Sequence, residues 1–476
     1  MTMVADEGTF VVRAEPAAAT KTTPATGPIR DGARWLLPAG ALLLVAALAL
    51  YLADLVTHLS YMAAMRDLVV YRDGGLIVRH IGPAYNGHRA SPLYDWTGQN
   101  GVQFTYPPFA AVVFAVASVL PWTIMRWAMT LASLAALGLS AWLTFGALGY
   151  RNRPRVRLGA TCGVSALALL TEPVQQTLGL GQVNLLLMLL IVADLLTFAG
   201  TGAGTGARAA GGRTRWWQGI GIGIAAGVKL TPLIFIPYLL IVRRYRQAAT
   251  ATAAFAATVA LGYAILPRDS GDYWADRLFL NANRIVFLGT RGNQSLRGVA
   301  IRLAGSVTSG TAPWVAAGVL VVIVGLISAA ILYRAGQPVP ATLACALTGL
   351  LVSPLSWDHH WVWVALGIAL LGHLGAQARG LIRAAWWGAG GAMFAVFGAW
   401  PQLWDAQAGL TPAGLVWYGP GTYFATGDKP WYYEFHWHGL QLVAGNIFVL
   451  AGLVALAAIA VAALRLWLRR TRIPGG

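Results

Sequence analysis

Long apolar runs recur along this chain from residue 35 to residue 466, and short polar or basic stretches separate them. Each run holds roughly 17 to 25 mainly apolar residues, and a helix of that length crosses a hydrocarbon layer of about 30 Å. The pattern therefore predicts an all-α polytopic membrane protein with about ten to twelve transmembrane helices. No internal repeat is visible in the pattern.

The composition supports this fold class and removes others. The chain of 476 residues is 57% hydrophobic and 11% charged, with a mean hydropathy of +0.61. Its net charge of +17 lies in short basic clusters between apolar runs, which is the distribution that membrane topology produces, so no nucleic-acid partner is expected. Both cysteines, Cys162 and Cys345, lie in apolar runs, so the sequence supports neither a disulfide framework nor a thiolate metal site.

Two regions are expected. Residues 1–33 are rich in Ala, Thr and Pro and lack an apolar signal core, so they predict a disordered cytoplasmic tail. Residues 34–472 form the membrane domain.

Basic clusters predict which end of each span is cytoplasmic. They predict that segments 59–106, 172–184, 268–312, 356–360 and 402–439 face outside. These segments carry almost all the residues with candidate chemistry. Two apolar stretches do not fit a simple count. Residues 107–121 are short enough to be re-entrant, and residues 217–242 are expected to form two half-helices broken at Pro232, since broken helices at membrane depth line cavities.

Asp67 and Asp73 follow the first span. Asp67 lies in an amphipathic stretch, whereas Asp73 adjoins two glycines. A carboxylate against an apolar wall can act as a general base toward a hydroxyl nucleophile. The alternative for both is a solvated acid at the membrane boundary.

The stretch TEPVQQTLGLGQVN carries Glu172, Gln182 and Asn184 between two short apolar runs. These groups can bind a sugar or a phosphate, or they can form a polar hairpin that satisfies its own backbone. Asp194 lies deeper in the apolar run, where an acid is functional by default.

Lys229 lies deep in an apolar stretch beside Pro232. A lysine beside exposed helix ends can hold a phosphate, and the alternative is that it snorkels to the interface. Arg291, Gln294 and Arg297 follow in an external amphipathic segment suited to an anionic lipid.

Asp358, His359 and His360 interrupt two apolar runs in SPLSWDHHW. Imidazole can hold a phosphate oxygen or exchange a proton. Neighbouring side chains on a regular helix point about 100° apart, so one histidine alone is expected to face a given cavity. The spacing does not favour a two-histidine metal site.

The motifs RDLVVYRDGG, YPP, EPVQQTLGLGQVNLLLMLLIVADLL, AAGVKLTPLIFIPYLLIVRR, NQSLRG and SPLSWDHHW together resemble the actinobacterial polyprenol-phosphate-sugar glycosyltransferases of family 87. The resemblance covers residues 35 to 465 and implies a GT-C fold in the bacterial plasma membrane, with a cavity open to the periplasmic side. It also implies that Asp67 is the catalytic acid–base residue and that His359 or His360 is the family histidine.

The function implied is an inverting α-1,2-mannosyltransferase. It would move mannose from polyprenyl-phosphate mannose to a glycolipid or lipoglycan of the phosphatidylinositol mannoside or lipomannan type, among membrane lipids. The expected substrate-binding groups are Asp73, Glu172, Gln182, Asn184, Lys229, Arg291, Gln294, Arg297 and Asp358, and no metal or other cofactor is required. Alternatives are arabinofuranose transfer from the matching donor and, in another class, a lipid transporter, for which repeat symmetry is expected.

Overall fold

The structure is a computed structural model that describes residues 33–57, 65–81, 93–95, 103–197, 215–276, 278–281, 288–400, 414–417 and 433–471. Every regular element in these ranges is a helix, and the extended pairings are two isolated bridges, Thr171 with Gly398 and Asn293 with Trp357. The predicted all-helical class is confirmed for the described part. The predicted tail, apart from Ala33, and most of segment 402–439 lie outside the described residues.

In chain order, the helices of the described part are α1 (Ala33–Thr57), α3 (Arg66–Val78), α4 (Pro108–Ala117), α5 (Trp122–Phe145), η1 (Gly146–Tyr150), α6 (Pro154–Leu169), α7 (Glu172–Leu180), α8 (Asn184–Leu196), α9 (Ile220–Val228), η3 (Thr231–Ile234), α10 (Phe235–Ile241), α11 (Tyr245–Ile265), α12 (Pro267–Ser270), η4 (Gly271–Ala275), η5 (Leu278–Leu280), α13 (Leu296–Ala304), α14 (Thr311–Arg334), α15 (Pro338–Val352), η7 (Asp358–Trp363), α16 (Val364–Gln377), α17 (Gly380–Phe397), η8 (Leu415–Trp417), η9 (Tyr433–His436), α18 (Leu440–Ala444) and α19 (Ile447–Thr471).

Five described helices are long and apolar enough to cross a membrane: α1, α5 with η1, α11, α14 and α19. A sixth candidate is the pair α7 and α8, which is bent by 116°. Three apolar helical stretches are shorter, namely 108–117, 231–241 and 338–352. Several apolar runs therefore form short or broken helices, which are tolerated at membrane depth where protein rather than lipid surrounds them.

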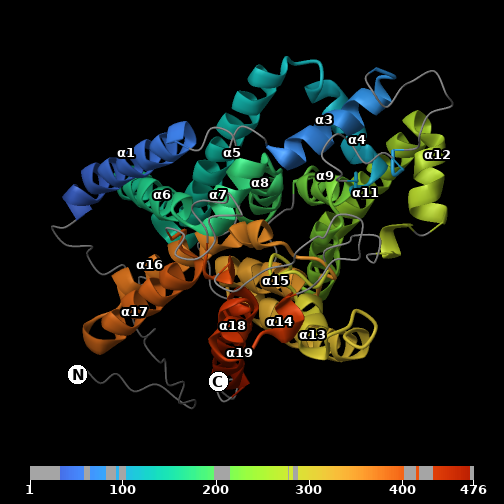
Figure 1. Cartoon of the computed structure of the whole chain (residues 1–476). Helices are drawn as coiled ribbons and strands as arrows, with labels where there is room; N and C mark the ends of the chain where they lie inside the picture. Colours follow the sequence, from blue (N-terminus) through green and yellow to red (C-terminus); the bar gives the residue numbers. More distant parts are fainter. Residues whose placement is uncertain are drawn as a thin grey trace, which may run out of the picture.

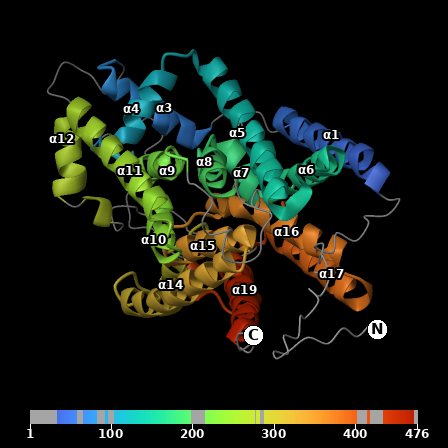
Figure 2. The same cartoon turned by 180° about the vertical axis from the view of Figure 1, so that it is seen from behind.

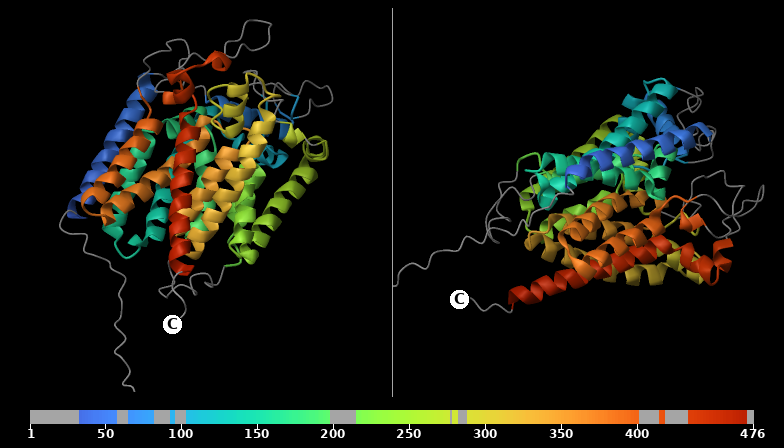
Figure 3. Two further views of the ribbon diagram at one scale, coloured as in Figure 1. Left: turned by 90° about the horizontal axis from the view of Figure 1, so that it is seen from below. Right: turned by 90° about the vertical axis from the view of Figure 1, so that its left-hand side faces the viewer.

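The helices form two halves that lie against each other. In Figure 1 the N-terminal helices, coloured blue to green, form one half, and α13 to α19, coloured yellow to red, form the other. The right-hand view of Figure 3 shows these halves as two stacked layers, and its left-hand view shows α1 beginning and α19 ending at the same end of the bundle. Figure 2 shows α8 beside α9, with α14 and α15 below them. The layers meet where α7 and α8 pack against η7 and α15.

Two breaks in helices turn polar groups into this junction. Gly181 ends α7 with φ +68°, and a Cβ there would lie 2.6 Å from the Cβ of Leu68 on α3. Only glycine combines that backbone conformation with so close an approach. The second break follows Val228, where Lys229 is extended (φ −150°, ψ 127°) before η3 begins at Thr231. The predicted break between two helical pieces is present, but it lies at Lys229 rather than at Pro232, which stands in the first turn of η3.

A close crossing of α1 and α6 supports the first layer. These helices pack along each other, and a Cβ at Gly159 would lie 2.6 Å from the carbonyl carbon and oxygen of Leu36. Small residues allow such close approach of helix backbones in membranes.

Gly159→Ala is expected to lower the melting temperature in detergent, because the new methyl group overlaps the α1 backbone and overpacking costs about 1–3 kcal/mol. Gly163→Ala on the same helix is the matched control, since its Cβ would have no atom within 4 Å. The control should melt no lower than wild type, because alanine favours a helix over glycine by about 0.5–1 kcal/mol. Equal melting temperatures for both variants would contradict a tight crossing.

Candidate active site

Asp67 lies in the first turn of α3 and is held by the turn between α7 and α8. The side-chain amide of Gln182 donates from Nε2 to Oδ2 of Asp67. Its oxygen Oε1 accepts from the hydroxyl groups of Tyr71, at 2.6 Å, and Tyr106, at 3.1 Å. Because both ends of the amide are occupied, its orientation is defined and the carboxyl group of Asp67 is fixed.

The two tyrosines were not among the residues that the sequence indicated. Tyr71 lies one turn beyond Asp67 and stacks on Phe114 of α4 at 4.2 Å between ring centroids. Tyr106 precedes Pro107 and Pro108, where α4 begins, and its hydroxyl oxygen lies 2.8 Å from that of Tyr71. The YPP motif was the available signal, since its prolines fix where α4 begins and so where the tyrosine ring lies.

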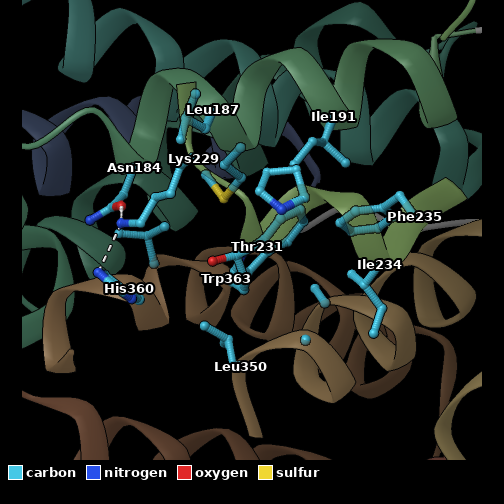
Figure 4. Close-up of a pocket in the computed structure, with 15 residues that line it drawn as sticks. Asn184, Leu187, Ile191, Lys229, Thr231, Ile234, Phe235, Leu350, His360 and Trp363 are labelled. Atoms are coloured by element: carbon cyan, nitrogen blue, oxygen red, sulfur yellow. Dashed lines mark hydrogen bonds between the residues drawn. The ribbon is translucent and has the colours of Figure 1, made fainter. Parts of the chain in front are cut away.

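Lys229 joins the two layers. Its ammonium nitrogen lies 2.8 Å from Oδ1 of Asn184 and 2.8 Å from Nε2 of His360, as Figure 4 shows. The ammonium also lies 5.7 Å from the ring centroid of Tyr106. The lysine thus points inward to polar partners on α8 and η7, and the geometry differs from the snorkelling alternative.

His359 and His360 take different partners. Nδ1 of His359 lies 3.0 Å from Oδ1 of Asp358, while the His359 carbonyl accepts from Asn184 Nδ2 and Thr177 Oγ1, both at 2.9 Å. Nε2 of His359 is buried and has no hydrogen-bond partner among the described residues. The segment is a 3₁₀ helix rather than an α-helix. The two imidazole rings are in edge-to-face contact with their centroids 4.9 Å apart, so the divergence expected for a regular helix is not seen.

A pocket extends from this polar group into the junction of the layers. Asn184, Lys229 and His360 form its polar end. Figure 4 shows apolar side chains along the rest, from Leu187 and Ile191 of α8 to Ile234, Phe235 and Leu350. A ligand with a charged head and an apolar chain would match this order.

The electrostatics of Asp67 suit proton transfer. It lies on α3, outside the helices that are long enough to span a membrane. Burial raises the pKa of its carboxyl group, while His359, the Gln182 hydrogen bond, Lys229 and Arg66 lower it in part. A carboxylate with a raised pKa is a stronger base than an ordinary aspartate.

The other predicted binding residues have their contacts elsewhere. Arg291 donates to the Trp417 carbonyl at 3.0 Å and lies over its ring, and Arg297 lies over the ring of Trp314 at 5.0 Å. Gln294 is fully buried and donates to the carbonyl groups of Arg291 and Gly445, both at 2.6 Å. Apart from Arg291 itself, these partners belong to η8, α14 and the end of α18 rather than to the group around Asp67 and Lys229.

The motifs NQSLRG and SPLSWDHHW pair with each other. Asn293 and Trp357 form an isolated antiparallel β-bridge. On either side of it, the backbone N–H of Gln294 donates to the Ser356 carbonyl at 2.7 Å, and that of Asp358 donates to the Gly292 carbonyl at 2.9 Å. This pairing holds the chain just before the histidines.

The remaining acids of the predicted site lie apart from Asp67. Asp73 lies six residues beyond Asp67 on α3 and is partly exposed, and Glu172 is fully buried beside Asp358. Among the described residues, no group of three or more His, Cys, Asp or Glu side chains is placed to hold a metal ion.

Comparisons with known proteins place the chain in a family. Residues 104–354 match glycosyltransferase family 87. The chain belongs to that family. The match spans Gln182, Asn184 and Lys229, whereas Asp67 and the histidine pair lie beyond its ends.

Curated relatives cover more of this family 87 chain. A polyprenol-phosphate-mannose-dependent alpha-(1-2)-phosphatidylinositol mannoside mannosyltransferase of Mycobacterium tuberculosis is 32% identical over 67% of the chain and 72% of its own length. A polyprenol-phosphate-mannose-dependent alpha-(1-2)-phosphatidylinositol pentamannoside mannosyltransferase of Mycolicibacterium smegmatis is 31% identical over 81% of the chain and 83% of its own length. No solved structure gave a significant match.

Asp194 has a structural partner that the sequence did not reveal. The residue is 3% exposed, and its Oδ2 accepts from the backbone N–H of Ile222 at 2.8 Å, with Gly219 and Gly221 also donating to its carboxyl group. A carboxylate at this place satisfies free N–H groups at the N-terminus of α9 and interacts favourably with the helix dipole. The intramembrane acid thus has a local structural role.

Asp194→Asn is expected to lower the melting temperature, because it removes a negative charge worth about 0.3–2 kcal/mol from the start of α9. Sugar transfer per folded molecule should not change. Thermal melting and transfer assays on the same purified sample measure both quantities. A loss of transfer at normal stability would instead place Asp194 in the reaction.

Proposed function

We propose that this chain transfers mannose from polyprenyl-phosphate mannose to a phosphatidylinositol mannoside, or a related lipoglycan, and forms an α-1,2 linkage. The curated relatives support the proposal, since their names agree on donor, linkage and type of acceptor. Membership of family 87 supports glycosyl transfer as the reaction.

One observation carries the proposal for the site. A single turn, Gly181 to Asn184, holds a carboxylate through Gln182 and a lysine ammonium through Asn184. The ammonium lies at the polar end of an apolar pocket. Transfer from a lipid phosphate needs these three features together: a base for the acceptor, a cation for the phosphate and an apolar surface for the lipid chain.

In the proposed reaction, Asp67 takes the proton from the acceptor hydroxyl group. The hydroxyl oxygen forms a bond to the anomeric carbon of mannose as the bond from that carbon to the phosphate oxygen breaks. Polyprenyl phosphate leaves with the electron pair. Attack opposite the leaving group inverts the β-linked donor to an α-linked product, and a general base typically contributes about 10²- to 10⁴-fold.

Lys229 and His359 neutralise the negative charge that develops on the leaving phosphate. Two N–H groups of the Lys229 ammonium interact with Asn184 and His360. The third N–H group can donate to a ligand. Nε2 of His359 is the second donor, oriented by Asp358. Fixed donors in a site poor in water stabilise such charge more strongly than in solution.

The proposal includes a GT-C fold with about ten to twelve membrane segments, counting the short and broken helices. The end of the bundle that carries α13 and α18 would face the periplasm of a bacterial plasma membrane. Donor and acceptor would then both reach the site from the surrounding lipid.

The direct test offers the purified protein polyprenyl-phosphate mannose or polyprenyl-phosphate arabinofuranose with a phosphatidylinositol mannoside acceptor. The expected product carries one added α-1,2-mannose. An arabinose product would replace the donor assignment. Absence of transfer with both donors, together with lipid movement in vesicles, would overturn the enzyme assignment in favour of a transporter.

Asp67→Asn is expected to reduce kcat by about 10²- to 10⁴-fold, because the amide is nearly isosteric but cannot accept the hydroxyl proton. Asp73→Asn on the same helix is the matched control and should lose far less. Initial rates at saturating donor and acceptor measure the effect. Equal losses, or a larger loss for Asp73→Asn, would mean that the base is misassigned.

Lys229→Gln is expected to raise the KM for the lipid-phosphate donor by more than the KM for the acceptor, because it removes the cation at the phosphate end of the pocket. Arg334→Gln removes a cation from the end of α14, away from the pocket, and should change neither value. Separate titrations of donor and acceptor give the two constants. An equal effect on both substrates would contradict the assignment.

A further inference from the structure

Glu172 and Asp358 bring two carboxyl groups together behind His359. Glu172 begins α7 and is 0% exposed, and Asp358 begins η7 and is 4% exposed. Their side chains are in hydrogen-bonding contact. One oxygen of Glu172, Oε1, accepts from the indole Nε1 of Trp417 at 3.0 Å.

The other oxygen, Oε2, is buried and finds no donor among the described residues. Two ionised carboxylates in contact repel each other strongly when water is excluded, so such a pair holds one proton. A proton carried by Oε2 gives this oxygen a hydrogen bond to donate. The unsatisfied oxygen is thus explained if one of the two groups is a neutral acid.

The surroundings indicate which group carries the proton. Oδ1 of Asp358 accepts from His359 N at 2.7 Å and lies 3.0 Å from His359 Nδ1, and two donors stabilise an anion. Glu172 receives one neutral indole N–H. The charged group beyond that indole is Arg291, which lies over the ring of Trp417 at 4.7 Å.

We propose that Glu172 is a positioning residue that acts as a neutral acid and donates a hydrogen bond to Asp358. Asp358 then remains a carboxylate, holds Nδ1–H of His359 and supports a positive charge on that imidazole. Nε2 of His359 is thereby directed at the substrate. This inference rests on the proposed function, in which His359 binds the leaving phosphate.

The inference makes the two members of the pair behave oppositely when each is changed to its amide. Glu172→Gln keeps an acceptor for Trp417 and a donor for Asp358, so it reproduces the neutral acid. Asp358→Asn removes the anion that His359 needs. If Glu172 instead bound substrate as a carboxylate, Glu172→Gln would be the damaging change.

The experiment measures mannose transfer from polyprenyl-phosphate mannose by wild type, Glu172→Gln, Glu172→Ala, Asp358→Asn and His359→Ala, with melting temperature as the control for folding. Glu172→Gln should retain most of the wild-type kcat and keep it at alkaline pH at least as far as wild type does, because an amide has no such proton to lose. Glu172→Ala and Asp358→Asn should lose about 10- to 100-fold, as is common when the partner that orients a functional histidine is removed.

The outcomes separate the inference from the function on which it rests. No transfer by wild type overturns the function, and full activity of His359→Ala overturns the role of His359. Suppose that wild type transfers mannose and His359→Ala is impaired. A loss of kcat in Glu172→Gln as large as in Asp358→Asn then overturns the neutral acid, as does a loss of its activity at a lower alkaline pH than in wild type. If Glu172→Ala does not fold, the comparison of Glu172→Gln with Asp358→Asn decides alone.

Discussion

The hydrogen bonds of the Lys229 ammonium group link the two layers of helices at the centre of the described structure. An ammonium group among apolar helices is costly unless other polar groups replace its water. The break after α9 turns Lys229 out of the helix, where Asn184 and His360 meet it, each at 2.8 Å. Because these partners belong to α8 and η7, the interaction joins the two layers.

The same turn that supplies Asn184 also supplies Gln182, and this proximity links the two ends of the site. Gln182 fixes Asp67, and Asn184 fixes Lys229. Gly181 permits the turn through its positive φ and lets it approach α3 closely. The positions of Asp67 and Lys229, the proposed base and cation, are therefore linked through a few residues of backbone. Rigid support of this kind favours catalysis by proximity.

The sequence could predict the helical class and a break within 217–242, because apolar runs and helix-breaking residues act locally, but it placed the break at Pro232 instead of Lys229. It could not predict partners far apart in the chain, such as Tyr106 with Gln182 or Trp417 with Glu172, which are 76 and 245 residues apart. The presence of an amide in the sequence also does not reveal its hydrogen-bond partner. Gln294 was predicted to bind substrate, but its side chain donates to two backbone carbonyl groups.

The placement of the acids bears on stereochemistry. Retention of configuration needs a carboxylate that attacks the anomeric carbon as a nucleophile, whereas inversion needs one base on the far side of the sugar. Asp358 is occupied by His359, and Glu172 lies in contact with Asp358. In the proposed reaction Asp67, whose carboxyl group is close enough to His359 and Lys229 for their charges to lower its pKa in part, serves as that base. In the same proposal the phosphate lies at Lys229, and the reaction is then a single displacement with inversion.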